Sequence, residues 1–430
     1  MFTRIALLFL CLCCIAPSRS GAQVTETARG YIEDLCSPRM HGRGYALKGD
    51  RKASRYIACE YRKTGLKKVA GSWYQPFTVS INTQSSGLAL RIDDREFTPG
   101  VEYIVAQGSP SFSGQCNLYH MDRSGLPDSV WMDQIPDGTF LLLDNNTGTG
   151  ETEEQTSLLN ELVARLEQSP PASCEGIIIY SDSKLTLKGF RERLPVPVIY
   201  LRSQEDLGNA VSLYLEVDSR YDPGYMTRNV MAFIPGEEYP DSLIIFTAHY
   251  DHLGTMGSGV YFPGANDNAS GVAMILSLAG HYAGEEHRPS CSMLFIAFSA
   301  EEIGLLGSRY YVEHPVFPLE NTKFLINIDL AGNGQEGITV VNGSVYRSSF
   351  DLLKMINDRE LYLPAVKSRG EACNSDHCPF HLAGVPGFFI YTMGGSTAYH
   401  DIYDTPGSLP LRMFDRYFKL LVSFTDSIQQ

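Results

Sequence analysis

Residues 243–271 read LIIFTAHYDHLGTMGSGVYFPGANDNASG, and this stretch predicts the centre of the fold. An apolar run from Leu243 to Ala248 indicates a buried strand that ends in a cluster of histidine and aspartate side chains. A loop rich in glycine and asparagine follows, contains Asp267, and leads into the apolar periodicity of residues 272–278, which is typical of a helix. Because parallel sheets place ligands at the carboxyl ends of their strands, imidazole and carboxylate groups at this point predict a metal site.

Beyond residue 225, short apolar runs alternate with helical patterns up to a final amphipathic helix. The runs are NVMAFIP, LIIFTAH, SMLFIAFSA, KFLINIDL, GITVVNG and GVPGFFIYT. Strands that are almost wholly apolar are buried on both faces, and their alternation with helices predicts an α/β fold with a mostly parallel mixed sheet flanked by helices. Residues 23–70 are predicted to be mainly helical and residues 73–105 to form strands. We therefore assign residues 23–105 and 221–430 to one domain.

Residues 106–220 differ from the rest of the chain in their sequence pattern and are predicted to form a small inserted α/β domain. The apolar runs FLLLD, GIIIYSD and VPVIYL alternate with polar turns and one helical segment, TSLLNELVARLEQ. This stretch contains no cluster of potential metal ligands. The length of the chain, 430 residues, also favours two structural units over a single hydrophobic core. An elaborated edge of the main domain is the alternative interpretation.

The first 22 residues, MFTRIALLFLCLCCIAPSRSGA, have the pattern of a secretory signal peptide. A basic residue precedes an apolar run that is too short to span a membrane, and small residues predict cleavage after Ala22. The expected location is the periplasm or the extracellular space. Lipid attachment through Cys11, Cys13 or Cys14 is the alternative. No later apolar segment is long enough to predict a membrane span.

The charge of the chain disfavours nucleic acid as a partner. The chain has 35 basic and 49 acidic residues, a net charge of −14, and loss of the two arginines of the leader changes it to −16. Such a charge opposes binding to nucleic acid and to anionic membrane surfaces. Nothing in the sequence indicates an obligate protein partner. Cys373 and Cys378 are close enough in sequence to pair in an oxidising compartment, or they are two buried thiols.

Five groups of acidic and imidazole side chains fall at the ends of predicted strands or in the loops just after them. They are His249 with Asp251, Asp267, Glu301 with Glu302, Asp329, and the run Tyr399, His400 and Asp401. Buried carboxylates are costly unless they are paired or bind a metal. Five such groups at one edge of a sheet therefore favour metal binding over chance.

This inventory suits two divalent ions that share one carboxylate. Asp267 is predicted to be the bridge because its loop is rich in glycine and asparagine. The terminal ligands, one imidazole and one carboxylate for each ion, are predicted to be His249, His400, Glu302 and Asp329. Adjacent residues at a strand end point in different directions, so Glu301 is expected to stand apart from the ions and to accept a proton from a water between them.

Asp251 is predicted to orient one of the histidines. It lies two residues after His249 and can accept the second imidazole N–H, which fixes the tautomer that binds the metal. An ordinary turn aspartate is the alternative, since aspartate is common in turns.

Six motifs, in order along the chain, resemble those of the M28 family of zinc aminopeptidases. They are AHYDHLG, GANDNASG, SAEEIGLLGS, NIDLAG, SDHCPFHLAGVP and YHDIYDTP. The segments RGYIEDLCSPRMHGRG and YIACEYRKTGLKK are similar to the opening helices of that family. The inserted stretch, with GTFLLLDNN, ASCEGIIIYSD and LPVPVIYL, resembles the protease-associated (PA) domain that several members carry.

The resemblance implies the phosphorylase/hydrolase-like fold of zinc exopeptidases and a site for two zinc ions. It places His249 and Asp329 on one zinc and Glu302 and His400 on the other, with Asp267 as the bridge and Glu301 as the general base. Tyr399 matches a tyrosine that in some members donates to the tetrahedral oxyanion. Asp376 and His377 match a recurrent pair near the pocket, for which catalytic and structural roles remain equally open. The family also implies a cis peptide bond after Asp267.

The implied reaction is the hydrolysis of an amino-terminal peptide bond in a peptide with a free α-amine. Glutaminyl cyclases on the same scaffold, which use one zinc and form pyroglutamate, are the first alternative. They tend to lack the insertion and to carry serine after the bridging aspartate, where this chain has Asn268. Carboxypeptidase action is less favoured because no helical dimerisation domain follows the YHDIYDTP motif. A binding protein without activity is disfavoured because all the candidate ligands and Glu301 are present.

Overall fold

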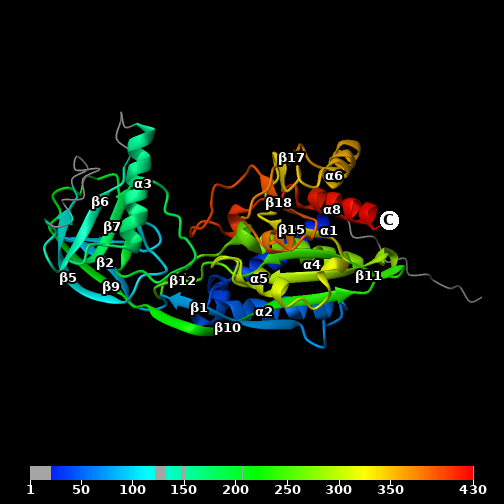
Figure 1. The fold of residues 1–430 in the computed structure, drawn as a ribbon, viewed down its shortest axis with the longest axis horizontal. Helices are drawn as coiled ribbons and strands as arrows, with labels where there is room; N and C mark the ends of the chain where they lie inside the picture. The colour runs from blue at the N-terminus through cyan, green and yellow to red at the C-terminus, as the bar shows by residue number, and fades with distance from the viewer. Residues whose placement is uncertain (1–20, 122–131, 133, 147–151, 206, 430) are drawn as a thin grey trace, which may run out of the picture.

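The computed structural model describes residues 21–429, apart from residues 122–131, 133, 147–151 and 206. The predicted leader therefore lies outside the described residues, except for Gly21 and Ala22. Two eight-stranded sheets organise the chain, one in each of two units that lie side by side (Figure 1). None of the described helices combines the length and the apolar character needed to cross a membrane.

The main sheet has the strand order β1-β10-β14-β11-β15-β18-β16-β17. Its strands are β1 (Tyr74–Thr83), β10 (Arg220–Ile234), β11 (Tyr239–His249), β14 (Cys291–Phe298), β15 (Thr322–Asp329), β16 (Gly337–Val341), β17 (Val366–Ser368) and β18 (Gly387–Met393). The central strands β14, β11, β15 and β18 are parallel, whereas β1–β10, β10–β14 and β16–β18 are antiparallel pairs. This arrangement confirms the predicted mixed sheet with a parallel centre.

Helices cover both faces of the main sheet, as the apolar strands predict. Successive side chains of a strand point to opposite faces, so Ile244 and Phe246 of β11 join one apolar cluster and Leu243 and Ile245 another. The first cluster includes helices α1 (Gly21–Leu35), α2 (Gly49–Lys63), α4 (Gly271–Tyr282), α6 (Arg347–Glu360) and α8 (Phe414–Ile428). The second includes α5 (Leu306–Glu313) and α7 (His377–Leu382).

The second sheet has the order β3-β2-β9-β5-β6-β7-β8-β4. Its strands are β2 (Leu88–Ile92), β3 (Arg95–Phe97), β4 (Tyr103–Val105), β5 (Phe112–His120), β6 (Thr139–Asp144), β7 (Cys174–Ser181), β8 (Val198–Arg202) and β9 (Ser212–Val217). Helix α3 (Glu153–Gln168) packs on this sheet through Leu159, Leu162 and Leu166, which share a core with Leu141 and Ile177 (Figure 1). The second unit thus has an apolar core of its own.

The second unit begins earlier in the chain than the sequence pattern predicts. Residues 88–105, which we assigned to the main domain, pair with the second sheet, because β2 lies beside β9 and β4 beside β8. The chain leaves the main sheet at Thr83 and returns at Arg220, two residues that face each other on paired strands. The insertion therefore spans residues 84–219. The alternation of apolar and polar residues in this stretch is compatible with either sheet. Pairing with strands distant in sequence determines which sheet the stretch joins, so the boundary predicted from periodicity alone was wrong.

Apolar packing joins the two units next to the end of β11. The loop after this strand contains the short strands β12 (Thr255–Met256) and β13 (Val260–Tyr261). Its side chains Leu253, Met256 and Phe262 are buried in the same cluster as Val105 and Leu187 of the inserted unit. The inserted unit is therefore packed against the edge of the main sheet where the predicted ligands lie.

Candidate metal centre

The parallel strands bring most of the predicted ligands to one edge of the main sheet. His249 and Asp329 are the last residues of β11 and β15, and Glu301 and Glu302 follow the end of β14. His400 lies in the loop after β18. Because these four strands are neighbours in the sheet, residues far apart in sequence come together.

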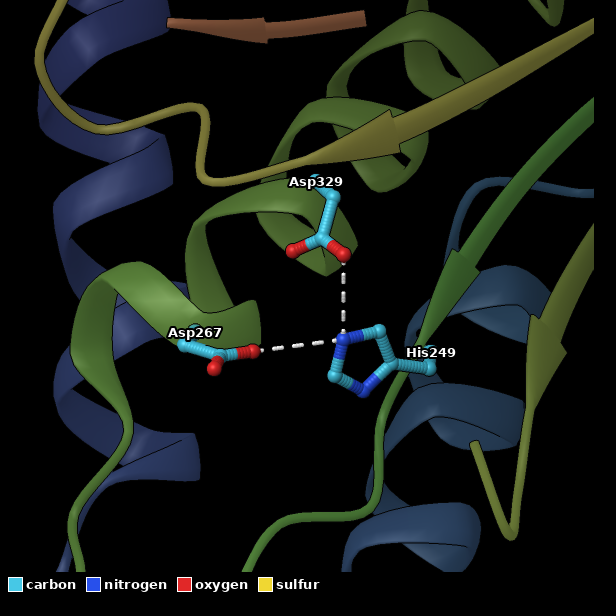
Figure 2. Close-up of side chains that lie close together, drawn as sticks. All are labelled: His249, Asp267 and Asp329. Atoms are coloured by element: carbon cyan, nitrogen blue, oxygen red, sulfur yellow. Dashed lines mark ion pairs between the residues drawn. The ribbon is translucent and has the colours of Figure 1, made fainter. Parts of the chain in front are cut away.

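Asp267 lies between two histidines and directs one carboxylate oxygen toward each. It sits in a π-helical turn, Ala265–Ser270, that precedes α4, and its peptide bond to Asn268 is cis, as predicted. Its Oδ1 is 3.3 Å from Nε2 of His249, and its Oδ2 is 2.9 Å from Nε2 of His400. Figure 2 shows the first contact together with Asp329, whose Oδ2 is 3.4 Å from the same His249 nitrogen.

Glu302 belongs to a second group of imidazole and carboxylate side chains. Its Oε2 is 3.3 Å from Nε2 of His400, and its Oε1 is 2.6 Å from Nδ1 of His252. Two sets of ligand atoms lie close enough together to hold a metal ion, namely His249, Asp267 and Asp329, and His252, Asp267 and Glu302. His252 was not among the site residues predicted from the sequence, although it stands in the AHYDHLG motif.

Glu301 stands apart from both groups. Its Oε2 is 4.0 Å from Nε2 of His249, and 14% of its side chain is exposed. Its backbone N–H donates to Oδ1 of Asp251 over 3.2 Å, and the hydroxyl of Tyr45 donates to Oδ2 of Asp251 over 3.0 Å. Asp251 therefore fixes the turn that carries Glu301.

The contact between Asp251 and His249 differs from the predicted one. Nδ1 of His249 lies 3.2 Å from the backbone carbonyl oxygen of Asp251 but 3.9 Å from its carboxylate. The carboxylate instead accepts hydrogen bonds from the N–H of Glu301 and the hydroxyl of Tyr45. The imidazole is thus oriented by the predicted residue through its main chain.

Burial of several carboxylates at one point shifts their ionisation. Burial raises the pKa of Glu301 well above 4.5, and the nearby carboxylates of Asp376, Glu302 and Asp329 act in the same direction. Burial also raises the pKa of Asp329. In Asp267, by contrast, hydrogen bonds to the histidines outweigh burial and hold the pKa well below 3.8.

In the histidines, the same negative charge raises the pKa against the effect of burial. Burial would lower the pKa of His249, but Glu301 and Asp329 raise it well above 6.5. Burial would likewise lower the pKa of His400, but Glu302 and Asp267 raise it to about 9. The raised pKa values reflect the negative charge of the surrounding carboxylates, and the same charge favours the binding of a metal cation in place of the imidazole protons.

The residues present fit divalent metal ions. Oδ1 of Asp329 is buried and has no hydrogen-bond partner in the described part of the chain. A buried carboxylate oxygen without a partner is costly, and a cation would compensate it. Imidazole nitrogen and carboxylate oxygen are also the donors that zinc takes in catalytic sites.

A buried arginine supports the turn that carries Asp267. Arg43 is fully buried and donates to the carbonyl oxygens of Tyr250, Pro263 and Gly264 over 2.9, 2.6 and 2.7 Å, and to that of Asp267 over 3.3 Å. Arg43 was not predicted as a site residue. Arg43 stands in the segment RGYIEDLCSPRMHGRG, which the sequence singles out only by its resemblance to the opening helices of the M28 family.

Asp404 holds the same turn from the other side, and it too was not predicted. Its carboxylate accepts hydrogen bonds from the backbone N–H groups of Asn266 and Asp267, at 2.9 and 3.0 Å. Burial raises the pKa of Asp404 to about 6. In the sequence, Asp404 stands in the YHDIYDTP motif, four residues after His400, and only this motif drew attention to it.

Tyr399 and the pair Asp376 and His377 belong to neither group of potential ligand atoms. The Tyr399 ring stacks on the His400 imidazole with 3.9 Å between centroids and is 45% exposed. Burial raises the pKa of Asp376 to about 7 and lowers that of His377 to about 4. Nε2 of His377 contacts the carbonyl oxygen of Ala372 at 2.8 Å, and a disulfide joins Cys373 to Cys378.

Comparisons with known proteins show that this chain is similar to peptidases. Residues 229–425 match the model of peptidase family M28. Aminopeptidase YwaD of Bacillus subtilis is 28% identical over 239 residues, which are 51% of this chain and 49% of that protein. Leupeptin-inactivating enzyme 1 of Streptomyces exfoliatus is 27% identical over 44% of this chain and 40% of its own length. The chain thus aligns with about half the length of these relatives or less.

Two solved structures share the fold over nearly the whole chain. BSAP, a zinc aminopeptidase from Bacillus subtilis, superposes with a TM-score of 0.67 and 20% identity, over 93% of each chain. A peptidase M28 precursor from Shewanella amazonensis superposes with a TM-score of 0.69 and 16% identity, over 95% of this chain and 96% of that one. At these identities the likeness establishes the fold and not the activity.

Proposed function

Because this chain belongs to peptidase family M28, whose model matches residues 229–425, we propose that it is an aminopeptidase with two zinc ions. The observation that carries the proposal is Asp267, which directs one oxygen to His249 and the other to His400. One zinc would be held by His249, Asp267 and Asp329, and the other by Asp267, Glu302 and His400. BSAP, which has the same fold, is a zinc aminopeptidase, and this supports the choice of zinc.

Glu301 is the proposed general base. When bound, zinc would supply a Lewis acid for the scissile carbonyl and lower the pKa of the attacking water. Glu301 lies beside His249 without occupying a ligand position, so its carboxylate is free to accept the proton of the water and to return it to the departing amine. Asp251 keeps Glu301 in place through the backbone N–H. We assign Tyr399 the stabilisation of the oxyanion.

The proposed substrates are peptides with a free amino terminus. The aminopeptidase YwaD of Bacillus subtilis, which aligns with about half of this chain, supports this substrate class.

Three peptides test this reaction against its alternatives. The zinc-loaded chain is incubated with a leucine peptide, its amino-acetylated form and a peptide that begins with glutamine. We expect release of leucine from the first, no cleavage of the second and release of free glutamine from the third. Ammonia and pyroglutamate from the glutamine peptide would identify a cyclase instead. Release of carboxy-terminal residues would identify a carboxypeptidase.

We also propose that residues 84–219 form a PA-like domain and that the chain is exported after cleavage near Ala22. The insertion between two paired strands supports the first proposal. The disulfide between Cys373 and Cys378 supports export, because disulfides persist in oxidising compartments. Amino-terminal sequencing of the protein from the periplasm or medium should begin at Gln23, whereas a cytosolic protein with an intact leader would contradict export.

A further inference from the structure

An extended segment of the inserted unit runs along the candidate metal centre. We call residues 184–190 the strap; they lie between β7 and β8 and form no regular secondary structure. The strap contains none of the predicted ligands. It nevertheless contacts the loop of residues 397–401, which carries His400, and the turn that carries Glu302.

Leu187 holds His400 by two main-chain contacts. Nδ1 of His400 lies 2.9 Å from the carbonyl oxygen of Leu187, and the N–H of Leu187 donates to the carbonyl oxygen of His400 over 2.9 Å. A histidine that donates from Nδ1 leaves Nε2 free to bind a metal, and Nε2 is the nitrogen that faces Asp267 and Glu302. The Leu187 side chain is buried in the apolar core of the inserted unit, which anchors this contact.

Lys184 clamps the same loop on both sides of His400. Its Nζ donates to the carbonyl oxygens of Thr397 and Tyr399 over 2.9 and 3.0 Å and pairs with Asp401 over 2.6 Å. These contacts use all three protons of the ammonium group. His400 has a φ of 53°, a left-handed conformation that a side chain adopts at a cost unless its surroundings enforce it. Lys184 and Leu187 together supply such surroundings.

Gly189 brings the strap against the turn of Glu302. A Cβ atom at Gly189 would collide with the backbone carbonyl oxygen of Glu302, so this position requires glycine. In the part of the chain that the structure describes, no hydrogen bond joins the strap to His249 or Asp329. The strap therefore contacts one half of the centre only.

We propose that the strap is a positioning element for the Glu302–His400 half of the metal centre. The inserted unit selects the tautomer of His400 and fixes its loop, whereas the His249–Asp329 half is built by the main domain alone. This inference rests on the proposed two-zinc function. Its consequence is that damage to the strap weakens one zinc-binding step and spares the other.

Zinc titration of the metal-free, full-length protein by calorimetry tests this asymmetry. Lys184→Ala removes the clamp, Lys184→Arg restores donors to the same carbonyl groups, and Lys188→Ala is the matched control. Lys188 is exposed and lies in the same strap, but it takes no part in the hydrogen bonds and the ion pair by which the strap holds the loop of His400. We expect Lys184→Ala to weaken one of the two binding steps roughly 10- to 100-fold. The affinity of the other binding step should not change. The Lys184→Arg and Lys188→Ala variants should bind both ions about as tightly as the unmodified chain.

A second pair of variants tests the contact with Glu302. Gly189→Ala should weaken the same step, whereas Gly30→Ala, where an added Cβ meets nothing within 4 Å, should not. Unchanged binding of both ions by Lys184→Ala would overturn the strap inference and leave the two-zinc proposal intact. Equal weakening of both steps would also overturn it, since that result indicates a general loss of structure. If the unmodified chain binds a single zinc, the two-zinc proposal fails and the inference fails with it.

Discussion

Glu301 is the residue on which the proposed chemistry depends most directly. Glutamine has the same shape but cannot accept a proton, so Glu301→Gln is expected to lower kcat roughly 100- to 10,000-fold. Zinc content should not change, because Glu301 is not a proposed ligand. Elemental analysis and steady-state kinetics on the same sample check both statements. The control is Glu285→Gln, an exposed position, and a fully active Glu301→Gln protein would exclude the role of general base.

Arg43 makes a separate prediction about the support of the centre. In Arg43→Met the carbonyl groups of Tyr250, Pro263 and Gly264 lose their donors while they remain buried. The free energy of unfolding is therefore expected to fall by about 3 kcal/mol or more, and zinc affinity should fall with it because the Asp267 turn loosens. Urea denaturation measures the first effect. Arg39→Met is the control, since Arg39 forms an exposed ion pair with Asp34 and should change stability by about 0.5 kcal/mol or less.

At the scale of single residues, the sequence predicts the centre better than its supports. Proposed ligands such as His249 and Asp329 are recognisable because they stand at the ends of apolar strands, and strands of a parallel sheet end at one edge. Arg43 and Asp404 carry no such signal, and His252, which follows the same strand as His249, has nothing in its spacing that indicates its contact with Glu302. Their roles arise from contacts between segments that only the folded chain brings together, so residue type and spacing do not identify them.

Helix α8 shows how an element that carries no proposed ligand contributes to stability. Phe424 is fully buried and packs near Phe324 and Phe388, with 5.7 and 5.9 Å between ring centroids. Phe424→Ala is expected to lower the free energy of unfolding by about 3–5 kcal/mol. Arg416→Ala, on the exposed side of the helix, is the control and should stay within about 0.5 kcal/mol. Thermal melts with and without zinc measure both; a Phe424 variant as stable as the control would contradict this packing.

At the scale of elements, the pattern of the sequence predicts most strands and helices of the main sheet. Near-continuous apolar runs such as β11 and β14 have few alternatives to a buried parallel position. The strands of residues 88–105 are different, because their alternation is satisfied in either sheet. Only pairing with β8 and β9 assigns them to the insertion. The strap, which has no periodicity at all, offered no signal of its position beside the centre.

The whole molecule should respond to pH differently with and without zinc. In the metal-free protein Glu302 and Asp267 overcome the effect of burial and raise the pKa of His400 to about 9. A histidine whose folded pKa is raised contributes stability that is complete below its unfolded pKa, near 6.5, and is lost as the pH rises through the folded value. Burial lowers the pKa of His377 to about 4, so its contribution changes only below this window.

We therefore expect the melting temperature of the metal-free protein to fall between about pH 6.5 and pH 9. The zinc-loaded protein should keep its melting temperature over the same range, because a metal-binding imidazole has no proton to lose at Nε2. Thermal melts of chelator-treated and zinc-loaded samples at three pH values measure the difference. A metal-free melting temperature that is constant or rises over this range would contradict the charge distribution described for the centre.

The number of zinc ions per chain tests the central claim most directly. Metal-free protein is titrated with zinc while bound metal and release of the amino-terminal residue from a peptide are measured together. We expect binding to saturate at two ions per chain and activity to reach its maximum only as the second ion binds. Saturation at one ion with full activity would contradict a centre in which Asp267 bridges two zinc ions.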